Sequence, residues 1–168
     1  MIDFAAARRM MVDGQVRTSD VTDLRLIAAM LEIPRERFVP QDKADLAYLD
    51  FDLPVMEGTD GALARRAREI LQTLGASNVT VVTGPLIEGW PATAPYDAIL
   101  LNGSTEIEPQ ALLRQLKDGG RLVGVRGRGG AGKAVLVRAF GHEVSRRPIF
   151  DAAAPLLPGF AQPAAFVF

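Results

Sequence analysis

One segment of the sequence, Gly127–Lys133, matches patterns that bind phosphate. Its letters, GRGGAGK, fit both the G-x-G-x-x-G of dinucleotide sites and the G-x-x-x-x-G-K of P-loops. Both sites need a helix directly after the turn, because the helix N-terminus holds the phosphate. Residues 134–140 instead alternate and are rich in Val, which predicts a strand. We therefore interpret the segment as a glycine-rich hairpin turn. A nucleotide-binding protein that uses this segment is a weaker hypothesis.

The sequence offers few other side chains for catalysis or metal binding. It has no cysteine and one histidine, His142, which lies at a turn between two predicted strands. This composition excludes disulfides, iron–sulfur clusters, thiolate or multi-histidine metal sites and a cysteine nucleophile. Glu106 and Glu108 lie where a strand leads into a helix, and we interpret them as complementing the helix N-terminus.

Charge and hydropathy limit the classes of partner that the protein is expected to bind. The 168 residues carry a formal net charge of -1 with no basic stripe, so no nucleic-acid partner is expected. No apolar run is long enough to span a bilayer, and the first residues do not resemble a signal peptide. We therefore expect a cytoplasmic protein with no membrane partner.

The first part of the chain reads as a helical region followed by an arm. Apolar spacing predicts a helix from Phe4 to about Met11 and a second one that Ser19 or Asp20 caps and Pro34 ends. Residues 48–55 alternate, which is compatible with an extended arm. Residues 56–61 read as a turn-like junction.

From residue 62 onward helices and strands alternate. The pattern predicts a helix from Leu63 to Leu74 that Gly75 closes, and a helix after Pro109 that carries Leu112, Leu113 and Leu116 and that Gly119 and Gly120 stop. Strands are predicted at residues 78–82, 96–101, 121–125, 133–140 and 143–150, the last two as an antiparallel pair. The fold class is therefore α/β, a largely parallel sheet with an antiparallel edge. Ligands of such sheets bind beyond the carboxyl ends of the strands, which points to the loops at residues 83–86 and 102–106.

Several segments, taken in order, resemble the protein-L-isoaspartate O-methyltransferase family, in particular divergent bacterial members with a Pro-rich tail. The resemblance extends over nearly all of the chain to about residue 127. Each piece is weak alone, and their order makes the match strong. The pieces are Arg9–Val12, Gln15-Val16, Val21–Met30, Ile33–Pro40, Ala47-Tyr48, Asp52–Val55, Leu74-Gly75, Asn78-Val79, Val82–Gly84, Gly89–Pro91, Ala94–Asp97, Ile107–Leu116 and Gly119–Val123.

This resemblance implies a fold and a reaction. The fold is a Rossmann-like methyltransferase sheet, and the reaction moves a methyl group from S-adenosylmethionine to the carboxylate of an isoaspartyl residue in a protein or peptide, as a repair step. A carboxylate is already ionised at neutral pH and needs no general base to act as a nucleophile. Alignment of the reacting atoms and exclusion of water then supply most of the catalysis, which a chain without cysteine and with a single histidine can provide.

The resemblance also suggests site residues. Gly84, Pro85 and Leu86 match the family's position near the adenine, although Pro85 replaces an acidic residue there. Asn102 and Gly103 would lie near the methionine part of the cofactor, and Leu53, Pro54 and Val55 would flank the substrate peptide. No catalytic residue and no metal ligand is assigned.

One part of the family's pattern is missing. The family places a strand, a glycine-rich turn, a helix and a second strand between the arm and the Leu63 helix, and such a unit needs roughly 30 residues or more. Here only residues 56–61 separate Val55 from Ala62. We therefore expect a helical cap and arm at 1–55 and a methyltransferase-like domain at 62–168 without its first βαβ unit. Either the natural protein has this block and the printed sequence omits it, or the protein truly lacks it. The alternative to an active methyltransferase is a catalytically inactive relative with a binding or scaffold role.

Overall fold

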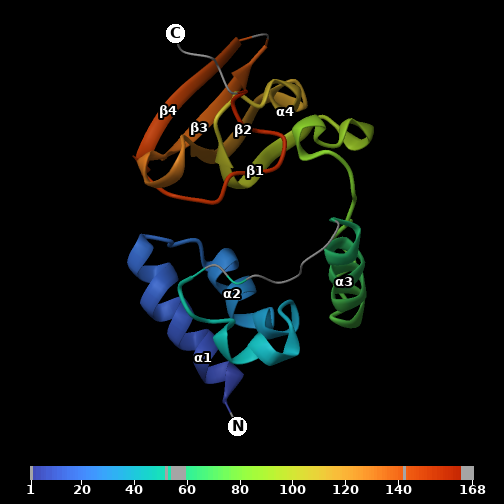
Figure 1. Cartoon of the computed structure of the whole chain (residues 1–168), viewed down its shortest axis with the longest axis vertical. Coiled ribbons are helices and arrows are strands. Elements are labelled where there is room, and N and C mark those ends of the chain that lie inside the picture. The colour runs from blue at the N-terminus through green and yellow to red at the C-terminus, as the bar shows by residue number, and fades with distance from the viewer. Residues whose placement is uncertain (1, 52, 54–59, 142, 164–168) are drawn as a thin grey trace. The chain divides into compact units, whose positions relative to one another are not determined.

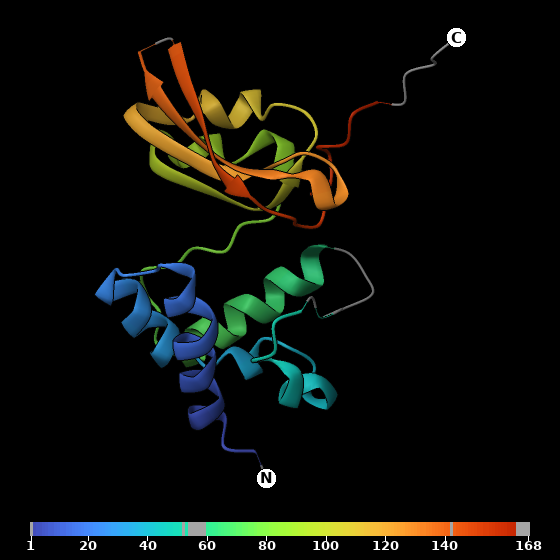
Figure 2. The same cartoon turned by 90° about the vertical axis from the view of Figure 1, so that its left-hand side faces the viewer.

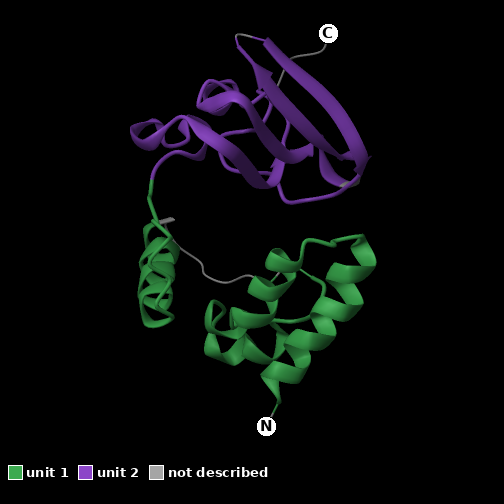
Figure 3. Cartoon of the chain, turned by 180° about the vertical axis from the view of Figure 1, so that it is seen from behind, with its two compact units in different colours: residues 1–83 green, residues 84–168 purple. Residues whose placement is uncertain are grey.

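The structure is a computed structural model that describes residues 2–51, 53, 60–141 and 143–163. The chain forms two compact units, residues 1–83 and 84–168 (Figure 3). Each unit is described by itself. The division expected from the sequence, with a junction at 56–61, stays a prediction. His142 lies outside the described residues.

Unit 1 is helical, as the periodicity predicts. Its α-helices are α1 (Phe4–Met11), α2 (Leu24–Glu32) and α3 (Asp60–Thr73). The predicted cap of the second helix is wrong, because Asp23 rather than Ser19 or Asp20 performs it. The Asp23 carboxylate accepts hydrogen bonds from the amides of Arg25 and Leu26, at 2.8 and 3.2 Å. Asp20 instead has a φ of 60° and ends a short 3-10 turn.

The core of unit 1 forms where α1 and α2 pack against the turns that follow them (Figures 1 and 2). Its buried residues come from four separate stretches of sequence and are Met11, Val12, Ile27, Val39, Ala47 and Tyr48. The predicted extended arm is wrong at its beginning, since residues 47–51 form turns and Tyr48 is buried.

Helix α3 ends as the sequence predicts, but the strand predicted after it is wrong. Gly75 has a φ of +70°, which a residue with a side chain rarely adopts, and the Ala76 amide bonds back to the carbonyl of Leu71 at 3.0 Å. Residues 78–82 form no strand. The segment is β-branched, but a strand also needs a neighbour with which to pair, and this segment has none among the described residues.

Unit 2 contains a four-stranded sheet in the order β1-β2-β3-β4 (Figures 1 and 2). The strands are β1 (Tyr96–Thr105), β2 (Leu116–Arg126), β3 (Lys133–Phe140) and β4 (Glu143–Asp151). β1 and β2 are parallel, and the other two pairs are antiparallel. The α/β class and the antiparallel edge are confirmed, but the expectation of a largely parallel sheet is wrong for the described strands, because only one of the three strand pairs is parallel.

The connections of unit 2 differ in one place from the prediction. The helix α4 (Gln110–Leu113) links β1 to β2 but is shorter than expected, because Leu116, Gly119 and Gly120 belong to β2. The segment 127–132 is a hairpin turn between β2 and β3, and Arg126 pairs with Lys133 in an antiparallel register. No helix follows the glycines, so the hairpin interpretation is confirmed and the phosphate-binding reading is wrong.

The core of unit 2 packs α4 against one face of the sheet and is closed by the C-terminal segment. Leu112 and Leu113 of α4 join Leu122, Val137 and other apolar side chains of the sheet. Phe160 of the C-terminal segment is fully buried in the same cluster. None of the helices in the described part of the chain has the length and apolar character needed to span a bilayer.

Candidate functional site

Unit 2 has a cavity lined by residues of all four strands, which include the last residue of each parallel strand, Thr105 and Arg126. Its volume is about 380 Å³. The floor is apolar and includes Leu101, Leu122 and Val137, and Gly124 leaves room there because a Cβ would lie 3.0 Å from that of Leu101. The remaining lining residues are Thr105, Glu108, Pro109, Val125, Arg126, Val135, Arg146 and Pro148.

The polar side chains of this cavity are largely engaged with one another. Glu108 and Arg146 form an ion pair at 2.5 Å. Glu106, nearby in the sequence, pairs with Arg128 at 3.2 Å and accepts a hydrogen bond from the amide of Gln162 at 2.7 Å. The two glutamates were expected to complement a helix N-terminus, and this expectation is wrong because arginines and an amide bind them instead.

The loop predicted at residues 102–106 is wrong for its first four residues, because Asn102, Gly103, Ser104 and Thr105 belong to β1. The C-terminal segment covers this end of the strand at Gly103. A Cβ built on Gly103 would lie 2.5 Å from Leu157 Cδ2 and 3.0 Å from the carbonyl oxygen of Pro155. Ser104 donates its amide to that carbonyl at 2.7 Å, and the Leu157 amide donates to the carbonyl of Ser104 at 2.9 Å. The chain itself therefore fills the space beside this end of the strand, while Asn102 stays exposed.

The predicted loop at Gly84–Leu86 lies near the same C-terminal segment. Its three residues are exposed, and a Cβ on Gly84 would meet nothing within 4 Å. The next residue, Ile87, packs against the core of unit 2. A Cβ built on Gly159 would lie 3.4 Å from the Cβ of Ile87. The structure thus places Gly103 beside Leu157, and Ile87, the residue after the other predicted loop, beside Gly159.

The described residues do not by themselves complete a site for the S-adenosylmethionine that the resemblance implies. That cofactor needs acceptors for its amino and hydroxyl groups, yet Pro85 offers none from its side chain and Glu108 is held by Arg146. Gly103 lies beneath Leu157 rather than beside open space. Among the described residues, no group of three or more histidine, aspartate or glutamate side chains is placed to hold a metal ion.

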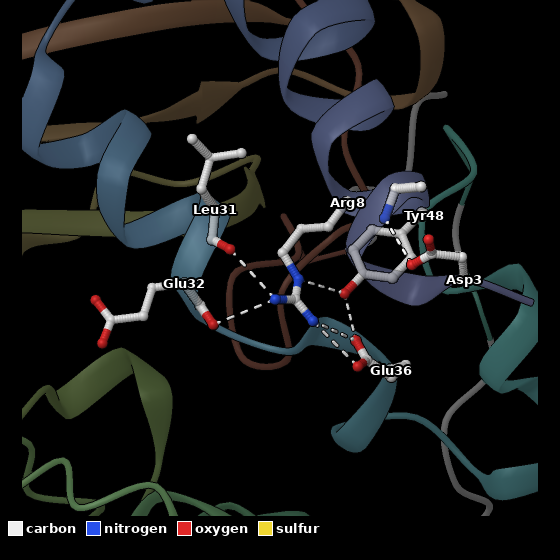
Figure 4. Close-up of polar contacts among 7 residues, drawn as sticks. Asp3, Arg8, Leu31, Glu32, Glu36 and Tyr48 are labelled. Atoms are coloured by element: carbon white, nitrogen blue, oxygen red, sulfur yellow. Dashed lines mark hydrogen bonds and ion pairs between the residues drawn. The ribbon is translucent and has the colours of Figure 1, made fainter.

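Unit 1 contains a second group of functional-type residues, a buried polar cluster of Arg8, Glu36 and Tyr48 (Figure 4). Arg8 Nη2 donates to both carboxylate oxygens of Glu36, at 3.1 and 3.3 Å, and its Nε donates to Tyr48 Oη at 2.8 Å. Tyr48 Oη in turn donates to Glu36. Nη1 of Arg8 reaches the carbonyl oxygens of Leu31 and Glu32 at the end of α2, at 3.2 and 3.4 Å. Three distant segments are therefore joined through one guanidinium group.

The cluster shifts the pKa values of its members in opposite directions. Burial favours the neutral form of Glu36, but the hydrogen bond from Tyr48 and the charge of Arg8 outweigh it, so the pKa of this carboxyl lies below its ordinary value. Burial and the neighbouring Glu36 carboxylate raise the pKa of the Tyr48 hydroxyl. Glu36 therefore stays ionised and Tyr48 stays protonated at neutral pH.

The predicted substrate residues fall at the edge of this unit. Leu53 is half-buried and packs against the core of unit 1. Pro54 and Val55 lie outside the described residues. Whether the three flank a peptide is not tested by the geometry and stays a prediction.

Sequence reasoning missed three features of these sites. The first is the role of Arg8, which no local pattern signals because its partners lie 28 and 40 residues away. The second is the buried anchor Phe160, whose only sequence signal is that it is an aromatic residue in a Pro-rich stretch. The third is Gln115, a buried side chain that accepts from the Trp90 amide and donates to the carbonyl of Glu88.

Comparisons of the sequence with known proteins agree with one another. Residues 59–138 match the family model described as Protein-L-isoaspartate(D-aspartate) O-methyltransferase (PCMT). The chain is 33% identical to Protein-L-isoaspartate O-methyltransferase 1 of Rhodopseudomonas palustris, covering 71% of this chain and 69% of that protein. It is also 33% identical to Protein-L-isoaspartate O-methyltransferase 2 of Pelobacter propionicus, covering 69% of this chain and 73% of that protein.

Those alignments run over 169 and 165 positions, although they include only 71% and 69% of the 168 residues of this chain. Each relative therefore carries residues within the matched region that this chain lacks. This agrees with the missing block that the sequence indicates.

Two solved structures share the fold. A protein-L-isoaspartate O-methyltransferase superposes with a TM-score of 0.73 at 18% identity, over 90% of this chain and 66% of the other. This chain therefore spans slightly under two thirds of that protein's length. A putative enzyme of the same description from Plasmodium falciparum, solved in complex with S-adenosyl-L-homocysteine, superposes with a TM-score of 0.63 at 11% identity, over 94% of this chain and 99% of the other.

Proposed function

Because this chain belongs to the protein-L-isoaspartate(D-aspartate) O-methyltransferase family, we propose that it carries out that family's reaction, methyl transfer from S-adenosylmethionine to an isoaspartyl carboxylate. The observation that supports this most strongly is the 33% identity to curated relatives over more than two thirds of each of them. Members of this family are S-adenosylmethionine-dependent enzymes, and a structural neighbour was solved with the demethylated product of that cofactor. The partner is a protein or peptide that contains an isoaspartyl residue, and the reaction takes place in the cytoplasm.

The same proposal assigns residues to each side of the reaction. Gly84, Pro85 and Leu86 together with Asn102 and Gly103 would contact the cofactor. Leu53, Pro54 and Val55 would contact the peptide. The place of Asn102 and Gly103 in the carboxyl-terminal part of the parallel strand β1 supports their assignment to the cofactor.

A second candidate function has one specific observation in its favour. Leu157 occupies the space beside Gly103, and Pro85 removes a hydrogen-bond acceptor, so the chain could bind isoaspartyl peptides without the cofactor. This is the role of a non-catalytic binding or scaffold relative. It makes a different prediction about the cofactor, which allows a direct test.

Calorimetric titration of the full chain with S-adenosylmethionine separates the two. The enzyme proposal predicts saturable heat, together with methyl transfer to an isoaspartyl peptide and none to the same peptide with an ordinary aspartyl residue. Asn102→Ala should weaken cofactor binding, while Asn78→Ala in unit 1 serves as the matched control and should not. Peptide binding without cofactor heat would instead establish the scaffold role.

A further inference from the structure

The helix α4 covers only part of the sheet face against which it packs. It has four residues and is about 6 Å long, whereas four strands that lie about 4.8 Å apart span about 14 Å. The cavity of about 380 Å³ lies on this face, because its floor residues Leu122 and Val137 belong to the same core cluster as Leu112 of α4. A cavity of this size is large enough for a small molecule.

The charged side chains that line the cavity leave one positive charge unbalanced. Arg146 is paired with Glu108 at 2.5 Å. The third charged residue of the lining is Arg126, whose guanidinium has no hydrogen bond or ion pair among the described residues. Lys133, which lies opposite Arg126 on β3, is paired with Asp151 at 2.5 Å. The free charge of Arg126 therefore favours an anionic group at the cavity.

The hydroxyl of Thr105 is a second polar group of the lining without a partner in the described chain. The residue is only 4% exposed, and its hydroxyl makes no hydrogen bond to any described residue. Each fully enclosed side-chain polar atom of the described chain has a partner, so this hydroxyl is accessible from the space that the residue lines. Thr105 is paired with Arg126 in the parallel register, which places both side chains on the same face of the sheet. A hydroxyl and a guanidinium are therefore available together for one ligand.

We infer that this cavity binds a small amphipathic carboxylate, a molecule with an apolar ring or chain and one terminal carboxylate group. The apolar part lies on Leu122 and Val137, where Gly124 leaves room. The carboxylate accepts hydrogen bonds from the guanidinium of Arg126 and the hydroxyl of Thr105, and its single charge matches the one unbalanced charge of the lining. None of the described residues proposed to contact the cofactor or the peptide lines this cavity, so the inference does not rest on the proposed function.

Calorimetric titration of the full chain with cinnamate tests this, with cinnamyl alcohol as the uncharged probe of nearly the same shape. We expect cinnamate to bind with a dissociation constant below about 1 mM, and the alcohol to bind at least about tenfold more weakly because it loses the charged hydrogen bonds. Arg126→Gln should raise the dissociation constant of cinnamate about tenfold. Arg121→Gln removes the same charge from an exposed position of the same strand outside the cavity, and should change it less than about twofold. Absence of saturable cinnamate binding, or equal effects of the two substitutions, would overturn the inference.

The hydroxyl of Thr105 can be tested with two further variants. Thr105→Val removes the hydroxyl at nearly constant volume, and should raise the dissociation constant of cinnamate at least about threefold. Thr105→Ser keeps the hydroxyl and should bind cinnamate within about twofold of the unsubstituted chain. Equal binding by the valine and serine variants would contradict the role of this hydroxyl.

Amide chemical-shift mapping locates the bound probe without any substitution. Cinnamate should shift the amide signals of Thr105, Gly124 and Val137, which line the cavity. Shifts confined to residues 84–86 and 102–103 would place the probe at the proposed cofactor residues and would contradict the inference, while leaving the proposed function open to its own test.

Discussion

Leu157 packs directly over the backbone of Gly103, so closely that a Cβ on the glycine would lie 2.5 Å from the leucine Cδ2. Glycine at 103 is therefore required by the C-terminal segment. The same contact decides whether the carboxyl-terminal part of β1 is open to a ligand.

Gly103→Ala should destabilise unit 2 by about 1–3 kcal/mol, because the added methyl group must displace Leu157. In a Leu157→Ala background the same change should cost less, since only the carbonyl of Pro155 remains close. Denaturant unfolding of the four chains measures this coupling. Gly84→Ala, where a Cβ meets nothing, is the control and should change stability by less than about 0.5 kcal/mol.

Phe160→Ala should remove about 3–5 kcal/mol of stability from unit 2, because the ring is fully buried in its core. The Phe160 carbonyl also accepts from the amides of Glu106 and Ile107, at 2.9 and 3.3 Å. Limited proteolysis after residue 151 should therefore become faster. Phe150→Ala, at an exposed position, should leave the unfolding free energy and the proteolysis rate nearly unchanged. A loss of stability comparable to that of Phe160→Ala would contradict the role of Phe160 as the anchor of the C-terminal segment.

Glu36→Gln should cost about 1–3 kcal/mol at neutral pH, because it leaves the half-buried guanidinium of Arg8 without its carboxylate. The pKa of Glu36 is lowered in the folded state, so its contribution is full above the ordinary value of 4.5 and is lost as the pH falls through the folded-state pKa. The difference in unfolding free energy between the two chains should therefore shrink in acid. Glu32→Gln is the control, since only its backbone carbonyl contacts Arg8.

Gln115→Leu should loosen the loop at residues 88–90. The Gln115 side chain accepts from the Trp90 amide at 2.9 Å and donates to the Glu88 carbonyl at 2.7 Å, and a leucine leaves both groups unsatisfied. We expect a loss of about 1–3 kcal/mol and faster amide exchange at Trp90. Gln110→Leu, at an exposed side chain bound only to Glu108, should have neither effect.

The sequence predicted correctly those elements whose signals lie within a few neighbouring residues. The alternation of residues 133–140 and 143–150 predicted β3 and β4, and Gly75 marked the end of α3 because a left-handed residue must follow the helix. The glycine-rich turn was also interpreted correctly, since the strand pattern after Lys133 excludes the helix that a phosphate site needs.

The errors concern features that depend on distant parts of the chain. Residues 78–82 have the composition of a strand, but strand formation requires a partner, and the described chain supplies none. The cap of α2 was placed too early, at Ser19 or Asp20, whereas Asp23, directly before Leu24, performs it. The covering of Gly103 by Leu157 joins residues 54 positions apart, and no periodicity signals such a contact.

The hydrogen bonds of Arg8 to three separate segments affect the local unfolding of unit 1. Its guanidinium holds the last carbonyls of α2, the Glu36 carboxylate and the Tyr48 hydroxyl at once, so none of these segments can fray without breaking bonds to the others. Amides of α1, of α2 and of the turn before Tyr48 should therefore exchange with deuterium as one cooperative block. A cut just after residue 8 would release all three segments together.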